Sequence, residues 1–518
     1  MTVGGARVRL AEPVAALSLA TDLGMGQPLE QALRTCLLAI AAGNGLGLDG
    51  PTRSDTFYFA LLRFVGCTSD AHEQAALVGG DEIAYYAGVA PAVMGEMSEY
   101  LTFLVRRFSA GAPLVTRART VGRVLADGTG GAKRSLAIHC EVARMLAVRI
   151  GLPPRLGDCF AHVFERWDGK GLPGERSGEA IPVPARIVAA ARDVELFHRF
   201  GGWEVAADVL RRRRGKAYDP AVADLFLADG ERWLAQCAGD SVWDAALAAE
   251  PAPWIRIDDA RLDAVLEALA HFADLKSPFT RGHSPGVAAL AEGAARHAGM
   301  DEGEAVSLRR AALVHDLGRT GIPNGIWDKP GPLTRAEWER VRLHPYLTER
   351  VLSYAPATAP MAALAGAHHE RLDGSGYHRG SPAAMLPPAA RILAAADAYQ
   401  AMTEERPHRP ALSPQAAAGE LAAEADGGRL DGHAVQCVLA AAGHERGRRA
   451  AWPDGLSDRE VEVLRLIARG ASYKDVAGRL SISPKTAEHH VAHIYAKIGV
   501  SSRAAAALFA MERHLLAD

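Results

Sequence analysis

The sequence has few aromatic residues, no long apolar run and no closely spaced pair of cysteines. Phenylalanine, tryptophan and tyrosine make up 6% of the 518 residues. Because long β-branched alternating runs are also absent, the composition disfavours a strand-rich fold and predicts an all-α protein. The apolar stretch near the N-terminus is short and is interrupted by Glu12 and Pro13. This pattern predicts neither a signal peptide nor a membrane span, and no membrane partner is expected.

The cysteines and the charge narrow the class of protein further. The six cysteines lie far apart, which disfavours a thiolate zinc site or a disulfide framework and favours reduced thiols in a cytoplasmic protein. The formal net charge of −3 is small for this length, so no overall field attracts nucleic acid. A chain of this length predicts roughly two to four domains.

An internal repeat organises most of the chain. The segment "FERWDGKGLP" aligns with "HERLDGSGYH", which pairs Glu165 with Glu370 at an offset of 205, and the same offset pairs His139 with His344. At a larger offset, "ALLRFVG" matches "ALVHDLG". Self-similarity of this kind predicts two copies of one fold, and we place the domains at 1–250 and 254–445.

The two copies differ at the positions that can bind a metal ion. The second copy carries seven such residues, and they are His283, His315, Asp316, His344, His368, His369 and Asp397. The first copy has Gln31, Arg63, Phe64, His139, Val163, Phe164 and Arg192 at the matching places. Any one histidine is more simply explained as an ordinary core or surface residue. The first copy shows, however, that the fold does not require the set.

This set of imidazole and carboxylate groups can hold two neighbouring divalent ions with a bridging carboxylate. His315 and Asp316 end a predicted apolar helix, for which Gly318 is the expected stop, so both side chains can reach one centre. Six of the seven donors are missing from the first copy. We therefore expect the first copy to serve as a dimerisation or regulatory platform.

The second copy resembles the HD-GYP subgroup of the HD phosphohydrolase superfamily over most of 260–430. "HDLGRTGIPNGIWDKPGPLTRAEWERVRLHP" resembles the HD segment, "HHERLDGSGYHRG" the HHE-xx-DG-x-GYP motif, and "AAADAYQAMTEERPHR" the terminal aspartate segment. Members of the family are all-helical, bind two or three Fe or Mn ions and hydrolyse cyclic di-GMP. The resemblance implies that the seven residues are metal ligands, with Asp316 as the bridge. Phe279 stands where some members have an extra glutamate, which implies two ions, Fe or Mn.

The resemblance also implies roles in catalysis and substrate binding. His315, Asp316 and Arg319 are the expected catalytic residues. Two divalent ions can lower the pKa of a bound water and neutralise phosphate charge, which suits hydrolysis of a phosphodiester. The residues expected to bind the substrate are Arg406, Arg409, Gly376 and Tyr377, since arginine can grip a phosphate with two hydrogen bonds.

Three positions depart from the family pattern. Arg319 replaces a lysine, His378 replaces the proline of GYP, and Gln400 replaces a second aspartate. Because the GYP loop shapes substrate access, His378 leaves open whether the substrate is cyclic di-GMP or a related cyclic or linear dinucleotide.

Residues 453–518 form a different kind of segment. Ser457 and Glu460 predict a capping box that opens the first of four helices, and Ser483 followed by Pro484 predicts the start of the third. This succession of short helices is typical of a helix-turn-helix domain.

The segment resembles the LuxR-type DNA-binding domain at "REVEVL", "SPKTAEHHV", "IYAKIGV" and "SSRAAAA". The resemblance implies that the third helix enters the major groove of double-stranded DNA and that the last helix forms a homodimer. The implied DNA contacts are Lys485, Thr486 and His489 to the bases and His490 and Lys497 near phosphate. From 456 to 518 nine Lys/Arg oppose seven Asp/Glu, so DNA binding is expected to require the dimer. A module used only for protein contact is the alternative.

Two functions are therefore expected from the sequence. In the first, two tandem HD-type domains include one active metal-dependent cyclic dinucleotide phosphodiesterase, coupled to DNA-binding transcriptional regulation. In the second, a catalytically impaired HD domain senses the nucleotide for a LuxR-type transcription factor. The complete set of seven donors favours the enzyme, and the three departures favour the sensor.

Overall fold

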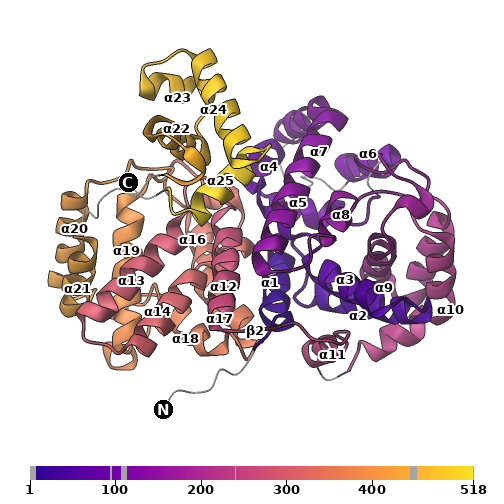
Figure 1. The fold of residues 1–518 in the computed structure, drawn as a ribbon, viewed down its shortest axis with the longest axis horizontal. Coiled ribbons are helices and arrows are strands. Elements are labelled where there is room, and N and C mark those ends of the chain that lie inside the picture. Colours follow the sequence, from indigo (N-terminus) through magenta and orange to yellow (C-terminus); the bar gives the residue numbers. More distant parts are fainter. Residues whose placement is uncertain (1–7, 94–95, 107–113, 240, 444–451, 517–518) are drawn as a thin grey trace. The chain divides into compact units, whose positions relative to one another are not determined.

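The computed structural model describes residues 8–93, 96–106, 114–239, 241–443 and 452–516 (Figure 1). Helices account for most of these residues, and the described strands, β1 (Val8–Arg9) and β2 (Arg256–Ile257), form one short antiparallel ladder. Within the described ranges no helix combines the length and apolar character needed to cross a membrane. The expected all-α class is confirmed.

The chain divides into two compact units. The first comprises Met1–Cys67 and Glu73–Leu262, and the second comprises Thr68–His72 and Asp263–Asp518. The four helices of the C-terminal module group with the second unit.

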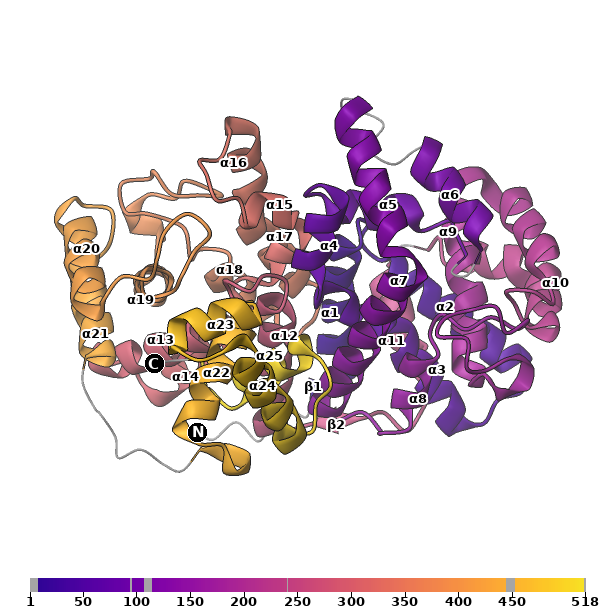
Figure 2. The same cartoon turned by 90° about the horizontal axis from the view of Figure 1, so that it is seen from above.

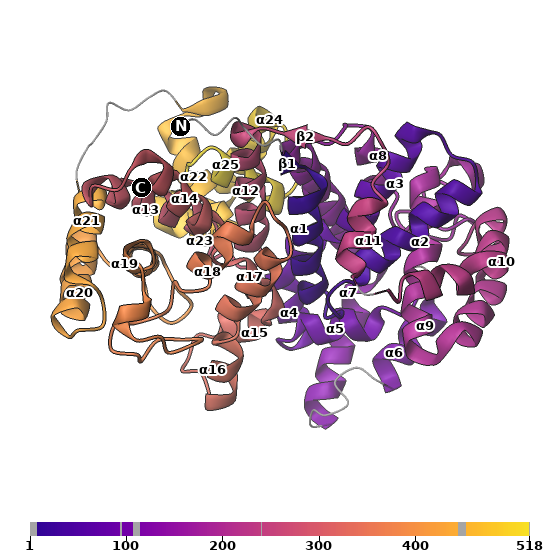
Figure 3. The ribbon, with the colours of Figure 1, turned by 90° about the horizontal axis from the view of Figure 1, so that it is seen from below.

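The helices described before β2 pack together around α2, α3 and α9. Of these, α2 lies beside α3, and both pack against α9 (Figure 3). In chain order they are α1 (Ala11–Gly24), α2 (Gln31–Gly45), α3 (Gly50–Leu62), α4 (Ala71–Val78), α5 (Glu82–Val89), α6 (Met97–Arg106), α7 (Leu114–Ile150), α8 (Leu156–Ala161), α9 (Val183–Arg213), α10 (Pro220–Gln236) and α11 (Val242–Ala248). Fully buried Leu33, Phe57 and Ile187 form part of the core between these helices, which explains their apolar inward faces.

The second unit repeats this arrangement, with α13 beside α14 and both next to α19 (Figure 2). Its helices before the C-terminal module are α12 (Asp259–Asp274), α13 (His283–His297), α14 (Glu302–Val314), α15 (Asn324–Trp327), α16 (Arg335–Val341), α17 (His344–Ser353), α18 (Ala359–Ala365), α19 (Pro388–Thr403), α20 (Pro414–Asp426) and α21 (Gly432–Ala442). α13 also packs against α21, so it lies at the centre of this domain.

One close approach of the main chain recurs in both units. A Cβ atom on Gly66 would lie 2.0 Å from the carbonyl oxygen of His139, and one on Gly318 would lie 2.1 Å from that of His344. These four residues are the ones that the sequence repeat aligns. The expectation that Gly318 ends the preceding helix is wrong, because α14 ends at Val314 and residues 317–321 form a 3₁₀ turn. Gly318 is instead required by the contact with His344.

The C-terminal module has the helices that its caps predict. They are α22 (Asp458–Ala468), α23 (Tyr473–Leu480), α24 (Pro484–Ile498) and α25 (Arg503–Glu512). Ser457 and Glu460 form the expected capping box, and the Ser483 side chain accepts the Thr486 N–H at the start of α24. Gly499 ends α24 in the left-handed conformation, with φ of 68°.

Candidate metal centre

The seven predicted donors come together from separate parts of the second unit. His283 begins α13, His315 and Asp316 directly follow α14, and His344 begins α17. His368 and His369 lie in the loop after α18, and Asp397 lies within α19. The donors therefore lie within helices or directly beside their ends, and these helices pack against one another and fix the positions of the donors.

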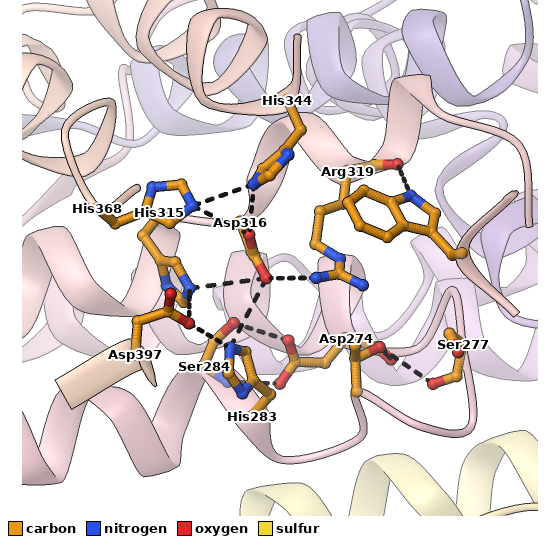
Figure 4. Close-up of polar contacts among 12 residues, drawn as sticks. Asp274, Ser277, His283, Ser284, His315, Asp316, Arg319, His344, His368 and Asp397 are labelled. Atoms are coloured by element: carbon orange, nitrogen blue, oxygen red, sulfur yellow. Dashed lines mark hydrogen bonds and ion pairs between the residues drawn. The ribbon is translucent and has the colours of Figure 1, made fainter. Parts of the chain in front are cut away.

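Asp316 occupies the middle of the site (Figure 4). Its Oδ2 atom lies 3.8 Å from Nε2 of His283 and 3.6 Å from Nε2 of His315. Its Oδ1 atom lies 3.4 Å from Nε2 of His344 and 3.5 Å from Nε2 of His368. One carboxylate therefore faces two groups of histidines, one with each oxygen.

The donors form two clusters, and a third group, His315, Asp316 and His368, links them. Donor atoms of His283, His315 and Asp397 all lie within 4.8 Å of one another, as do those of the second group, His344, His368 and His369. Among the described residues, His315 Nε2 and Asp316 Oδ1 are buried without a hydrogen-bond partner. Buried polar atoms are normally paired, so these two fit metal coordination.

Main-chain carbonyl groups orient three of the histidines. The Nδ1 atoms of His315, His344 and His368 lie 2.7, 2.6 and 2.6 Å from the carbonyl oxygens of residues 312, 341 and 365. A carbonyl oxygen can only accept, so Nδ1 carries the proton and the Nε2 lone pair is directed at the centre. Such a partner on the second ring nitrogen is usual for metal-binding histidines.

Two acidic residues that we did not predict support His283. The first is Glu404, whose Oε2 atom lies 2.9 Å from Nδ1 of His283. The predicted donor Asp397 contacts the other ring nitrogen, with 3.1 Å between its Oδ1 and Nε2 of His283. The second unpredicted residue is Asp274. Asp274 accepts hydrogen bonds from the Ser284 N–H and hydroxyl and so fixes the start of α13. Glu404 follows Asp397 by seven residues, about two helical turns, and this spacing could have identified it.

The electrostatics of the site suit metal ligands. Burial lowers the pKa of His344 to about 3, so its imidazole is neutral. Burial acts to raise the pKa of Asp316, but the charge of Arg319 and the contacts with the surrounding histidines hold it well below its ordinary value. Neutral imidazole and ionised carboxylate are the forms that bind a cation. His283 differs, because the effect of its burial is outweighed by Glu404 and Asp397, which raise its pKa to about 10, so a cation that binds there would displace a proton.

Arg319 is the third expected catalytic residue, and it also reaches the centre. Its Nη1 donates to Asp316 Oδ2 at 3.2 Å, and its guanidinium carbon lies 3.7 Å from the centre of the Trp327 ring. Stacking on an aromatic ring restricts the guanidinium to one face of the site. The structure thus brings His315, Asp316 and Arg319 into one contiguous group.

Comparison with known families gives two matches. Residues 134–222 and 267–434 match the HD domain family, and residues 454–510 match the luxR family of bacterial regulatory proteins. The 3'3'-cGAMP-specific phosphodiesterase 3 of Vibrio cholerae is 31% identical over 415 residues, which are 80% of this chain and 90% of that protein. The chain belongs to the HD-GYP phosphodiesterase family.

A solved structure and a second relative agree with this assignment. The crystal structure of a cyclic GMP-AMP specific phosphodiesterase from V. cholerae matches with a TM-score of 0.58 and 28% identity, over 84% of this chain and 98% of that one. A cyclic di-GMP phosphodiesterase of Thermotoga maritima is 37% identical over 147 residues, which are 28% of this chain and 40% of that protein. The resemblance that the motifs indicated is confirmed.

The structure places the expected substrate-binding residues of this phosphodiesterase in different settings. Arg406 donates to Glu404 Oε2 at 2.8 Å and lies at the edge of the site. The Tyr377 ring lies 4.7 Å from that of His369. Arg409, by contrast, donates to the carbonyl oxygens of residues 401, 402, 404 and 410 and holds the turn after α19. A Cβ on Gly376 would lie within 2.4–2.6 Å of main-chain atoms of residues 369–371, so this glycine shapes the loop.

The expected DNA contacts lie on α24. Lys485, Thr486 and His489 are exposed on one side of its first turns, and His490 is partly buried. Lys497 is exposed but its ammonium pairs with Glu460 at 2.7 Å.

Proposed function

We propose that the second unit hydrolyses a cyclic dinucleotide at a centre of two divalent cations, Fe or Mn, and that the C-terminal module binds double-stranded DNA as a homodimer. The observation that carries the first part is the position of Asp316, whose two oxygens face different histidine groups. The family assignment and the names of the relatives support the substrate class.

We assign the residues of the site different roles in hydrolysis. The seven donors would hold the cations, which when bound supply positive charge for phosphate oxygens and acidify water. Arg319 keeps a positive charge next to Asp316, and Arg406 presents a second guanidinium at the rim near His283. These two arginines are placed to bind phosphate oxygens and orient the scissile bond.

The substrate is either cyclic di-GMP or 3'3'-cGAMP. The sequence motifs favour cyclic di-GMP, whereas the relative that aligns over 90% of its length is specific for 3'3'-cGAMP. His378, which stands in the GYP loop, lies 3.7 Å from Glu349 and next to Tyr346. We therefore propose cyclic dinucleotide hydrolysis as the activity and leave the choice of base to a direct comparison of kcat/KM for the two compounds.

Contacts within the second unit support coupling between the metal centre and the DNA-binding module. The buried Arg281 side chain donates to the carbonyl oxygen of Ala468, the last residue of α22. A Cβ on Gly282 would lie 3.1 Å from Leu516. Both contacts come from the segment directly before His283. A shift of α13 on nucleotide binding would therefore reach the module.

The test is metal content and turnover of the purified full chain, prepared with Fe or Mn. We expect about two metal ions per chain, hydrolysis of one of the two cyclic dinucleotides, and loss of both properties in the double variant His315→Ala, Asp316→Ala. Arg335→Ala, an exposed position on α16, is the control and should behave as the wild type.

Protein that binds the nucleotide but shows neither metal nor turnover would refute the enzyme and establish the sensor. Coupling is tested with Arg281→Met, which should alter the effect of the nucleotide on DNA affinity while metal content stays unchanged. If Arg281→Met responds to nucleotide as the wild type does, this route of coupling is wrong.

A further inference from the structure

A cavity of about 350 Å³ in the first unit lies where that unit has lost its metal donors. Its walls include parts of α2, α4, α5, α6, α7 and α9 and the loops after α3 and α8, and these helices can be located in Figures 2 and 3. All seven positions that correspond to the donors of the second unit line it, namely Gln31, Arg63, Phe64, His139, Val163, Phe164 and Arg192. The first copy has kept the hollow of the duplicated fold and changed its lining.

The new lining excludes a metal ion. Phe64, Val163 and Phe164 offer no donor atom. Arg63 and Arg192 are cations that take the places of His315 and Asp397 in the repeat, and they repel a metal ion. At the corresponding positions carboxylates and imidazoles have therefore been replaced by guanidinium and apolar groups. The carboxylates that also line the cavity, Glu96, Glu165 and Asp193, already accept hydrogen bonds from arginine side chains or main-chain N–H groups.

Arg63 has buried hydrogen-bond donors that a ligand could satisfy. Among the residues that the structure describes, its Nε and Nη1 atoms are shielded from solvent and have no hydrogen-bond partner. Its guanidinium carbon lies 5.2 Å from the ring centre of Phe64 and 5.7 Å from that of Phe164. Burial and the charge of Arg192 lower the pKa of Arg63 to about 10, which leaves it cationic at neutral pH. The carboxylate that partly compensates Arg63, that of Asp193, is already paired with Arg192 and Arg213. Burying a guanidinium with so little compensation is unfavourable, and an anionic ligand would reduce that cost.

Two further groups at the cavity support a polar ligand. Arg192 donates from Nη1 to Asp193 at 2.6 Å, while its Nε is buried and unpaired within the described part of the chain. Asp193 also accepts from Arg213, so its single charge is divided between two guanidinium groups. Gln31 is only 4% exposed, and its Oε1 has no partner among the described residues. The cavity thus offers donors on Arg63 and Arg192 and an acceptor on Gln31 that have no partner among the described residues.

Aromatic rings form the remaining wall. Phe64 and Phe164 lie next to the two cations, and Tyr85, Tyr86 and Tyr100 line the side formed by α5 and α6. Guanidinium groups bind phosphate, and flat rings stack on nucleobases. The volume is near the lower end of the ~300–1,000 Å³ typical of small-molecule sites, which suits a mononucleotide better than a whole cyclic dinucleotide.

We propose that this cavity binds a nucleoside monophosphate, with the phosphate paired to Arg63 and Arg192 and the base against the aromatic rings. Hydrolysis of one phosphodiester bond of a cyclic dinucleotide gives a linear dinucleotide, and hydrolysis of the second bond gives two nucleoside monophosphates. The first unit would therefore bind the final product of complete hydrolysis by the second unit. Only this link to the reaction rests on the proposed function, because the binding site itself stands on the lining of the cavity.

The experiment is calorimetric titration of the metal-free full chain with GMP and AMP. Guanosine, which lacks the phosphate, and inorganic phosphate, which lacks the nucleoside, are titrated for comparison. The His315→Ala, Asp316→Ala background removes the metal centre as a competing site. We expect one equivalent of GMP or AMP to bind per chain in this background, with at least tenfold weaker binding of guanosine. We also expect at least tenfold weaker binding of the nucleotide to Arg63→Met. The exposed Arg232→Met on α10 is the matched control and should bind as the background does.

Loss of folding is separated from loss of binding by thermal unfolding without ligand. Because Asp193 pairs directly with Arg192 and Arg213, Arg63→Met removes no direct ion pair of Arg63 and should unfold at the same or a higher temperature than the background. Gln31→Leu supplies a second test, with an expected loss of affinity of several-fold. Absence of GMP and AMP binding in the wild type, or binding that both variants leave intact, would overturn the proposal. Since GMP is added directly, failure of the hydrolysis assay leaves this result interpretable.

Discussion

The carboxylate of Asp316 and the guanidinium of Arg319 lie in direct contact, with 3.2 Å between Oδ2 and Nη1. Arg319 is held there by the Trp327 ring on which it stacks. The family pattern has lysine at this position, so the chain has kept the charge and added a planar group that can donate two parallel hydrogen bonds. The contact joins Asp316, the carboxylate that we expect to bridge the two cations, to Arg319, which we propose binds a phosphate oxygen of the substrate.

Arg319→Met should lower kcat/KM for the cyclic dinucleotide by about 10²–10³-fold, because one preorganised donor to a developing negative charge is removed. Arg319→Lys keeps the charge and should stay within roughly tenfold of the wild type. Steady-state kinetics on metal-replete protein measure both. Equal losses in the two variants would show that the planar group, rather than the charge, matters.

Glu404→Gln should weaken binding of the cation near His283 by about 10–100-fold, the usual effect of removing a carboxylate that orients a metal-binding histidine. The carboxylate of Glu404 lies 2.9 Å from Nδ1 of His283 and also accepts from Gln400 and Arg406. Competition with a chelator gives the affinity. Glu420→Gln, on the exposed side of α20, is the matched control, and an equal loss there would contradict a specific role for Glu404.

Gly318→Ala should destabilise the second unit by about 1–3 kcal/mol, because the added Cβ would lie 2.1 Å from the His344 carbonyl oxygen and force the main chain apart. Metal affinity should fall with it, since His344 would move. Gly66→Ala should destabilise the first unit to a similar extent and leave metal content unchanged. Chemical denaturation followed by hydrogen exchange of each unit separates the two effects.

The control for this pair is Gly419→Ala. Gly419 is exposed within α20, and a Cβ there would meet no atom within 4 Å. Alanine is a better helix former by up to about 1 kcal/mol, so stability should rise slightly. Stability losses in all three variants would argue against a special role of the close approach.

The helices and the donor set could be predicted from sequence because both leave local or repeated signals. Ser457, Glu460 and Ser483 are caps whose hydrogen bonds depend only on neighbouring residues, and the structure has them as expected. The seven donors were identified by comparing the two copies, which separates residues that the fold requires from residues that it does not. His315 and Asp316 therefore stood out without a structure.

Other features depend on contacts between distant segments. Asp274 supports His283 through Ser284, which lies ten residues further along the chain, and no spacing rule connects an aspartate to that role. Gly318 looked like a helix stop because its contact with His344 is invisible in the local sequence. The losses in the first copy indicated only an absent metal site. That Arg63 and Arg192 line a preserved cavity follows from the structure alone.

If the exposed start of α24 contacts base edges, each of three single substitutions should weaken binding to a DNA site selected from random sequence by about 1–3 kcal/mol. They are Lys485→Ala, Thr486→Ala and His489→Ala. Binding to unrelated DNA should change less for Thr486→Ala than for Lys485→Ala, which also removes a charge. Electrophoretic mobility shifts at two salt concentrations measure both. Arg513→Ala, beyond α25, is the control. Unchanged affinity in all three variants would favour a module for protein contact.

The Glu460–Lys497 ion pair should make the stability of the DNA-binding module depend on pH. Burial alone would raise the pKa of Glu460, but hydrogen bonds from Lys497 and Ser457 lower it from 4.5 to about 2. Because the folded state favours the ionised carboxylate, the stabilisation is complete above pH 4.5 and is lost as the pH falls towards 2. Hydrogen exchange of α22 and α24 in the full chain, corrected for intrinsic rates, should show this loss in the wild type, at about 1 kcal/mol for a cap of this kind. Glu460→Gln should be less stable at pH 7 and should lack the pH-dependent part. A pH profile that is the same in both proteins would mean that Lys497 is free to contact DNA phosphate and contributes nothing to the cap.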